Sequence, residues 1–159
     1  MIIRPATGDD AALLRAMLYE AARWDPAGPR EPIEEVLADP VIRRYHDGWG
    51  RRGDAGVVSE LEGSPVGAAW HRLFAAEAPG FGFLDEQTPE LSIAVAPLHR
   101  GKGIGSMLLR AAMAQAREAG FRTLSLSVAA HNPARRLYQR AGFEKAAEHG
   151  GSWTMLARL

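Results

Sequence analysis

The sequence predicts a single α/β domain in which a mixed, largely antiparallel sheet carries helices on both faces. A strand, a long helix and a second strand follow one another between residues 91 and 128, and this order makes the two strands parallel. Two β-favouring runs, at 55–61 and 66–74, enclose a turn and predict an antiparallel hairpin. The chain has 159 residues and is 47% apolar, which suits one compact domain over residues 1–159.

The first third of the chain predicts an edge strand, a helix and a long loop. Residues 1–5 form the strand, and Thr7 caps a helix that ends near Arg23. Apolar residues recur on one face of this helix at i, i+3, i+4 and i+7: Leu14, Met17, Leu18 and Ala21. Four prolines between residues 24 and 54 predict a loop with only a brief helical stretch, at 33–38.

The second half of the chain alternates between the two hydrophobic periods. Apolar residues two apart predict strands, and apolar residues three or four apart predict helices. In order, the expected elements are a strand over 91–95, a helix that begins at Gly103 with a C-terminal cap at Gly120, a strand over 124–128, a helix from Asn132 to Gly142, and an antiparallel pair over 144–148 and 152–158.

The composition argues against several kinds of protein. Lys plus Arg and Asp plus Glu both number 19, so no net charge favours a nucleic acid or a membrane as partner. Cysteine is absent, which excludes disulfides and a cysteine nucleophile and fits a cytoplasmic protein. The five histidines have no metal-binding spacing, so we expect no metal. The N-terminus lacks the apolar stretch of a signal peptide, and no run approaches the ~20 apolar residues of a membrane span.

Three glycines spaced two apart join the strand over 91–95 to the following helix. Gly101, Gly103 and Gly105 allow consecutive backbone N–H groups to point into one concavity without obstruction by Cβ atoms. The positive end of the helix dipole lies at the same place, and Arg100 and Lys102 add full charges. The turn therefore suits a pyrophosphate group.

The spacing differs from that of two other phosphate-binding loops. A dinucleotide-binding GxGxxG motif fails because Ser106 stands where the third glycine would follow Gly101 and Gly103. The chain also lacks the GxxxxGK[ST] pattern of a P-loop. From the residues alone, the glycines either bind a phosphate or only make a tight strand-to-helix turn.

Two segments resemble motifs of the GNAT superfamily of N-acyltransferases. Residues 95–109 resemble its acyl-CoA-binding motif, whose RxxGxG core is Arg100, Gly103 and Gly105 here. Residues 132–143 resemble its later motif, in which an asparagine-led helix carries a tyrosine and ends in Gly-Phe. The resemblance implies the GNAT fold, in which the parallel strands splay apart to admit the co-substrate acetyl-CoA.

The resemblance also implies a set of residues that hold CoA. Backbone amides from about Arg100 to Ser106 would bind the pyrophosphate, and the strand edge near Val95 would pair with the pantetheine arm. The complete set is Ile93, Ala94, Val95, Arg100, Gly101, Lys102, Gly103, Ile104, Gly105, Ser106, Asn132, Ala134 and Arg135.

The expected reaction moves an acetyl group from acetyl-CoA to a primary amine by direct attack in a ternary complex. Tyr138 either protonates the departing thiolate or is a core tyrosine, since it lies on an apolar helical stripe. Glu90 either accepts the ammonium proton or is a solvated glutamate at a strand end. Ser125, Ser127 and His71 are lesser candidates. The alternative function is a non-catalytic acyl-CoA sensor.

The acceptor pocket and the assembly are less defined by the sequence. The loop over 75–89 mixes aromatic and acidic residues, so it either forms one wall of the pocket or is a flexible connector. Trp24, Trp49 and Trp70 belong either to this pocket or to the core. An exposed C-terminal strand could pair across a homodimer.

Overall fold

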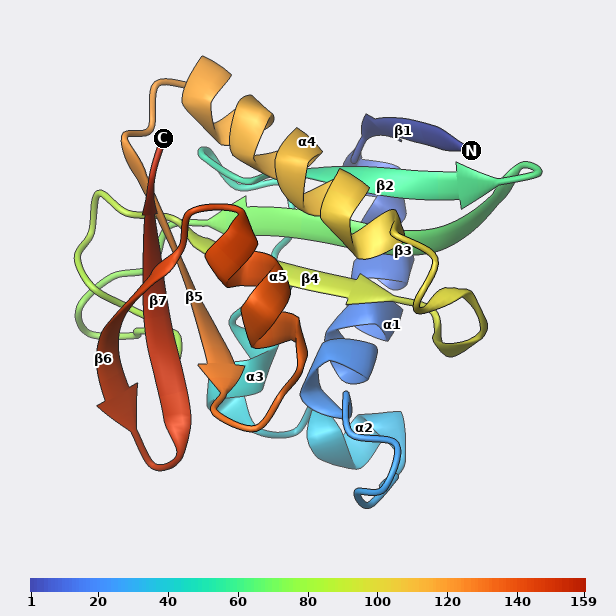
Figure 1. Cartoon of the computed structure of the whole chain (residues 1–159), viewed down its shortest axis with the longest axis horizontal. Coiled ribbons are helices and arrows are strands. Elements are labelled where there is room, and N and C mark those ends of the chain that lie inside the picture. The colour runs from blue at the N-terminus through green and yellow to red at the C-terminus, as the bar shows by residue number, and fades with distance from the viewer.

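The computed structural model describes all residues from Met1 to Leu159 and contains one seven-stranded sheet (Figure 1). The strand order is β1-β2-β3-β4-β5-β7-β6, and every neighbouring pair is antiparallel except β4 with β5. The strands are β1 (Ile2–Pro5), β2 (Ala55–Leu61), β3 (Ser64–Arg72), β4 (Glu90–Val95), β5 (Thr123–Ala129), β6 (Glu144–His149) and β7 (Ser152–Arg158). The helices are α1 (Ala11–Ala22), α2 (Ile33–Val36), α3 (Pro40–Arg43), α4 (Ile104–Glu118) and α5 (Ala134–Arg140), with single turns η1 (Gly8–Asp10) and η2 (Pro97–His99). None of the helices combines the length and the apolar character needed to cross a membrane.

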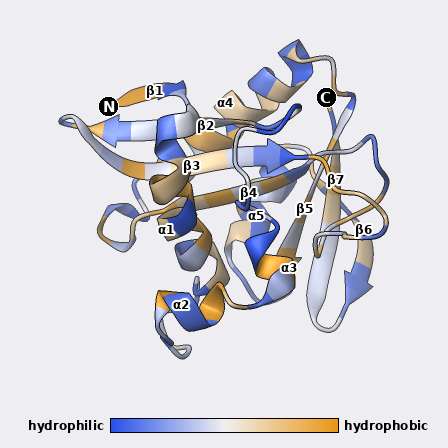
Figure 2. Ribbon diagram, turned by 180° about the vertical axis from the view of Figure 1, so that it is seen from behind, coloured by the Kyte–Doolittle hydropathy of each residue, from blue (hydrophilic) through white to orange (hydrophobic).

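Helices cover both faces of the sheet, as the sequence predicts. α4 and α5 lie in front of it in Figure 1, and α1 and α2 lie in front in the reverse view of Figure 2. Each face has its own apolar core, one under α4 and α5 and one under α1 and α2. The α1 and α2 ribbons mix hydrophilic and hydrophobic residues, as expected of helices that bury only one side (Figure 2). The predicted fold class is therefore confirmed.

Most predicted elements form close to their expected bounds, and two differ. The brief helix expected at 33–38 forms as α2 over 33–36. A further short helix, α3, follows it, because Asp39 caps α3 by accepting bonds from the Val41 and Ile42 amides at 2.8 and 3.3 Å. The hairpin turn is shorter than predicted, because Glu62 and Gly63 both adopt positive φ angles of 51° and 80° and complete it. β3 consequently begins at Ser64 and ends at Arg72.

The two parallel strands separate after a single pair. The only register pair between β4 and β5 joins Glu90 and Ser125, beside a hydrogen bond of 3.0 Å from the Ser125 amide to the Pro89 carbonyl. On their other edges, β4 stays paired with β3 and β5 with β7 throughout. The splayed pair implied by the GNAT resemblance is therefore present. Beyond Glu90, the facing edges of β4 and β5 have backbone groups without a strand partner, which a bound ligand can satisfy.

Candidate active site

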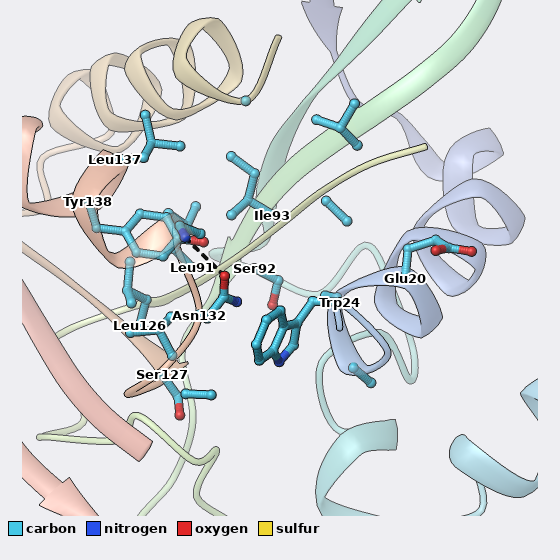
Figure 3. A pocket seen from close by; sticks show the side chains of 18 of the residues that line it. Glu20, Trp24, Leu91, Ser92, Ile93, Leu126, Ser127, Asn132, Leu137 and Tyr138 are labelled. Carbon is cyan, nitrogen blue, oxygen red and sulfur yellow. Dashed lines mark hydrogen bonds between the residues drawn. The ribbon is translucent and has the colours of Figure 1, made fainter. Parts of the chain in front are cut away.

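The separation of β4 and β5 opens a cleft of about 860 Å³. Its walls come from α1 and the segment after it, α3, β4, the loop that enters α4, β5 and α5. Figure 3 shows Trp24 projecting into the cleft from the end of α1, while Tyr138 and Asn132 enter from the opposite side. The cleft therefore brings together residues from the whole length of the chain.

A row of free backbone amides lies at one end of this cleft. Gly101 and Gly103 have φ angles of +75° and +83°, and a Cβ atom at either position would meet open space. The amides of residues 101–106 donate to no protein carbonyl, and the first helical bond is that of Met107 to the Gly103 carbonyl at 3.3 Å. Six free N–H groups at the start of a fifteen-residue helix form an anion site, which we call the amide cradle (residues 101–106).

The two cations predicted beside the cradle behave differently. Arg100 lines the cleft, where its Nε donates to the Val95 carbonyl at 3.0 Å and its Nη2 donates to Glu20 at 3.1 Å. Glu20 belongs to α1 and also pairs with Arg30 at 3.1 Å. Lys102 is exposed and does not line the cleft. Of these two cations, only Arg100 lines the cleft, and a bound anion would compete with Glu20 for its guanidinium group.

The other residues predicted to hold CoA are found in the cleft with one exception. The lining set includes Ile93, Ala94, Val95, Gly101, Gly103, Ile104, Gly105, Ser106, Asn132 and Ala134. The Asn132 side chain accepts the Ala134 amide at 2.9 Å, so it also caps α5. Arg135 lies outside the lining, because it donates to the Ala130 carbonyl at 2.5 Å and stacks on the Trp153 ring at 4.5 Å.

Glu90 is buried at the other end of β4 and lines the cleft. It is only 2% exposed, so the alternative of a solvated strand-end glutamate is wrong. The Tyr45 hydroxyl donates to Oε2, and the Phe81 amide donates to the same hydroxyl at 2.7 Å. Oε1 has no hydrogen-bond partner. Burial raises the pKa of Glu90 to about 7, although the Tyr45 hydrogen bond acts in the opposite direction.

Tyr138 lies both in the core and at the cleft, so it fits both alternatives that the sequence left open. It is 8% exposed and belongs to the core under α4 and α5, where its ring meets Phe143 edge-on at 6.1 Å. It also lines the cleft. Burial raises the pKa of its phenol above the usual value, and no hydrogen bond opposes that effect. The phenol is therefore neutral at physiological pH and can serve as a proton donor.

The sequence analysis did not identify the aromatic contacts of Glu90. Tyr45 lies just after α3, and its ring stacks on Phe81 at 6.2 Å with an interplanar angle of 17°. Gly80 has no room for a side chain, since a Cβ atom would lie 2.7 Å from the Tyr45 hydroxyl and closer still to Glu90 Oε1. Tyr45 has no helical or strand period around it, so nothing in the sequence marks it as a partner of Glu90.

The remaining candidates divide between the cleft and the core. Trp24 lines the cleft and contacts His131 at 4.9 Å, whereas Trp70 is fully buried and donates to the Tyr45 carbonyl at 2.7 Å. Ser127 lines the cleft, but the buried Ser125 and His71 do not. Trp49 packs against the core under α1. No cluster of three or more His, Asp or Glu side chains is arranged to hold a metal ion.

Comparison with known families and proteins identifies the class of this protein. Residues 15–143 match the family described as "Acetyltransferase (GNAT) family". This range contains the amide cradle, Glu90 and Tyr138. The chain belongs to the GNAT acetyltransferase family. It is 34% identical over 142 residues to streptothricin acetyltransferase of Streptomyces lavendulae, across 86% of this chain and 73% of that relative.

Two solved structures of this GNAT fold resemble the chain over its whole length. Ribosomal-protein-alanine N-acetyltransferase from Brucella melitensis has a TM-score of 0.71 and 28% identity, with 100% of both chains covered. The yncA protein from Salmonella typhimurium, solved with its cofactor acetyl-CoA, has a TM-score of 0.72 and 25% identity, with 100% of this chain and 94% of that chain covered. These matches confirm the predicted family, the fold and the class of acetyl-CoA-dependent N-acetyltransferase.

Proposed function

We propose that this GNAT acetyltransferase moves an acetyl group from acetyl-CoA to a primary amine by direct attack in a ternary complex, with Glu90 as the base and Tyr138 as the acid. One observation carries the proposal: the amide cradle lies at one end of the cleft, and a buried carboxyl group with an unpartnered oxygen lies at the other. The first feature suits a phosphate, and the second suits proton transfer.

The residues of the cleft fit CoA. The amide cradle and Arg100 would hold the pyrophosphate, since both offer donors to an anion. The free edge of β4 from Ile93 to Val95 would bind the pantetheine arm through its backbone groups. Asn132 and Ala134 would contact the arm from the α5 side. Acetyl-CoA supplies an activated acetyl thioester there.

Glu90 would remove the proton that keeps an amine from acting as a nucleophile. Its raised pKa of about 7 lies close to physiological pH, where a base combines a useful ionised fraction with adequate proton affinity. Its unpartnered Oε1 is the atom that would accept the proton. Tyr138 would donate its phenolic proton to the departing sulfur, because its neutral phenol lines the same cleft.

The named acceptors of the relatives support an amine acceptor without selecting one class. One relative is named for streptothricin and one structural neighbour for the alanine of a ribosomal protein. The acceptor of this chain is therefore proposed as an amine of a small molecule or a protein. The cytoplasmic location, the single domain over residues 1–159 and a homodimer remain predictions. The C-terminal strand β7 is paired on both sides, with β5 and β6, so the expectation that this strand is exposed is wrong. The strand near the C-terminus that could pair across such a dimer is β6, which forms one edge of the sheet.

Release of free CoA tests the proposed reaction. The protein would be incubated with acetyl-CoA and a panel of amines, and the liberated thiol would be titrated over time. We expect release that depends on an amine and falls strongly in Glu90→Gln. Binding of acetyl-CoA without release for any amine would contradict acyl transfer and support the alternative of an acyl-CoA sensor.

A further inference from the structure

The cleft wall around Tyr45, the hydrogen-bond partner of Glu90, is apolar and aromatic. Leu18 of α1 and Tyr45 belong to one hydrophobic core, and Ile42 of α3 packs against it. Phe81 completes this wall, which we call the acceptor wall (Leu18, Ile42, Tyr45 and Phe81), and all four side chains line the cleft. When the amino group of an acceptor reaches Glu90, the rest of the molecule must therefore lie against an apolar surface.

Phe81 is the one large side chain of the acceptor wall that stays open to solvent. Its exposure is 52%, although its ring is held parallel to that of the buried Tyr45. Its amide is also fixed by the bond to the Tyr45 hydroxyl. A rigid, half-exposed aromatic face beside a cleft suits a flat apolar group.

The charged side chains on the α1 side of the cleft already have partners. Glu20 is paired with Arg30 and Arg100, each at 3.1 Å. Arg23 donates to Glu31 at 2.6 Å and to the Ala22 carbonyl at 3.1 Å. The cleft has a further cation in Arg140, but this residue comes from α5. A carboxylate carried next to the reacting amine would thus find no free cation beside Glu90.

A second ammonium group on the acceptor would likewise find no free carboxylate in the cleft. The acidic side chains that line the cleft are Glu20 and Glu90. Glu20 is already paired with two arginines, and the reacting amine occupies Glu90. Any other charge would be moved from water to apolar surface without compensation, which is unfavourable.

We infer that the acceptor is a primary amine whose remaining body is uncharged and apolar, of the 2-phenylethylamine type, and that Phe81 selects it. This inference rests on the proposed acetyl transfer and specifies its acceptor. It distinguishes such monoamines from amino acids, which add a carboxylate, and from diamines, which add an ammonium.

Three amines test this selection: phenylalanine adds a carboxylate to 2-phenylethylamine, and 1,4-diaminobutane has a second ammonium in place of the ring. The probes are 2-phenylethylamine, phenylalanine and 1,4-diaminobutane, each assayed for kcat/KM by CoA release at saturating acetyl-CoA. We expect kcat/KM for 2-phenylethylamine to exceed both others by at least about tenfold, since the site offers no partner for the added charge. In Phe81→Asp, the ratio of diaminobutane to phenylethylamine should rise by at least about tenfold, because the new carboxylate pairs with the second ammonium.

Ile2→Asp is the matched control, since it makes the same change at a 63% exposed residue of the edge strand β1. It should leave the ratio unchanged. An equal or higher kcat/KM for phenylalanine or diaminobutane would overturn the inferred acceptor while leaving acetyl transfer supported. An unchanged ratio in Phe81→Asp would remove Phe81 as the selecting residue. If none of the three amines released CoA, the inferred acceptor would be refuted, and the wider panel of amines would decide acetyl transfer separately.

Discussion

Replacement of the buried carboxyl in Glu90→Gln should stabilise the protein at alkaline pH while it lowers turnover. The pKa of Glu90 rises from 4.5 to about 7 on folding because the side chain is buried. Since the folded pKa lies above the unfolded one, the stability linked to this group is fully present below about pH 4.5 and is lost as the pH rises through about 7. At 1.36 kcal/mol per pKa unit, the loss is about 3 kcal/mol.

Glutamine keeps the shape and the acceptor for the Tyr45 hydroxyl but cannot ionise. The variant should therefore match the parent near pH 5 and exceed its free energy of unfolding by about 3 kcal/mol at pH 8. For a domain of this size, that difference corresponds to a Tm higher by about 6 to 12 °C. Turnover should fall by about 10² to 10⁴, the usual contribution of a positioned base.

Urea denaturation at pH 5, 6, 7 and 8, followed by circular dichroism, measures the difference between parent and variant. Glu118→Gln is the matched control, because Glu118 is an exposed glutamate at the end of α4. A stability difference that stays constant between pH 5 and 8 would refute the raised pKa. Unchanged single-turnover rates in Glu90→Gln would refute the role of Glu90 as the base.

Four further variants test the other parts of the site. Gly103→Asp should abolish acetyl-CoA binding in calorimetric titration, because its carboxylate would repel the pyrophosphate from the cradle; near-parental affinity in a folded variant would contradict this. Tyr138→Phe should lower the single-turnover rate by about 10² to 10⁴ and leave acetyl-CoA affinity unchanged, whereas a parental rate would exclude the acid role. Tyr45→Phe removes a bond that lowers the pKa of Glu90, so the acid limb of the kcat/KM profile should move to higher pH; an unmoved limb would show that Tyr45 does not tune Glu90. Gly80→Ala should cost about 1 to 3 kcal/mol in urea denaturation, since its Cβ has no space, and a parental midpoint would argue against this packing.

The cradle could be predicted from the sequence because its causes are local. Positive φ angles at Gly101 and Gly103 are what glycine at these positions permits, and the helical period that begins at Ile104 fixes where the free amides lie. The same is true of the strands, whose alternating residues bury one or both faces. A pattern that repeats within a few residues needs no knowledge of the rest of the chain.

The surroundings of Glu90 could not be predicted because their causes are distant. Tyr45 lies 45 positions from Glu90, in a segment whose prolines and short helices give no period. Arg100 likewise pairs with Glu20, 80 positions away. The burial of a strand-end glutamate depends on such contacts, so the sequence alone left its environment open.

A buried ion pair at the end of β3 lies beside the segment that carries Tyr45. Arg72 is the register partner of Glu90 across β3 and β4, and it pairs with Asp54 at 2.6 Å with both side chains 1% exposed. The same guanidinium donates to the Arg44 carbonyl at 2.8 Å, in the residue before Tyr45. One cation thus holds the end of β3 and the Tyr45 segment together. Because a slip of one residue would turn Glu90 to the other face of the sheet, the register of β3 with β4 keeps Glu90 beside Tyr45, where burial raises its pKa.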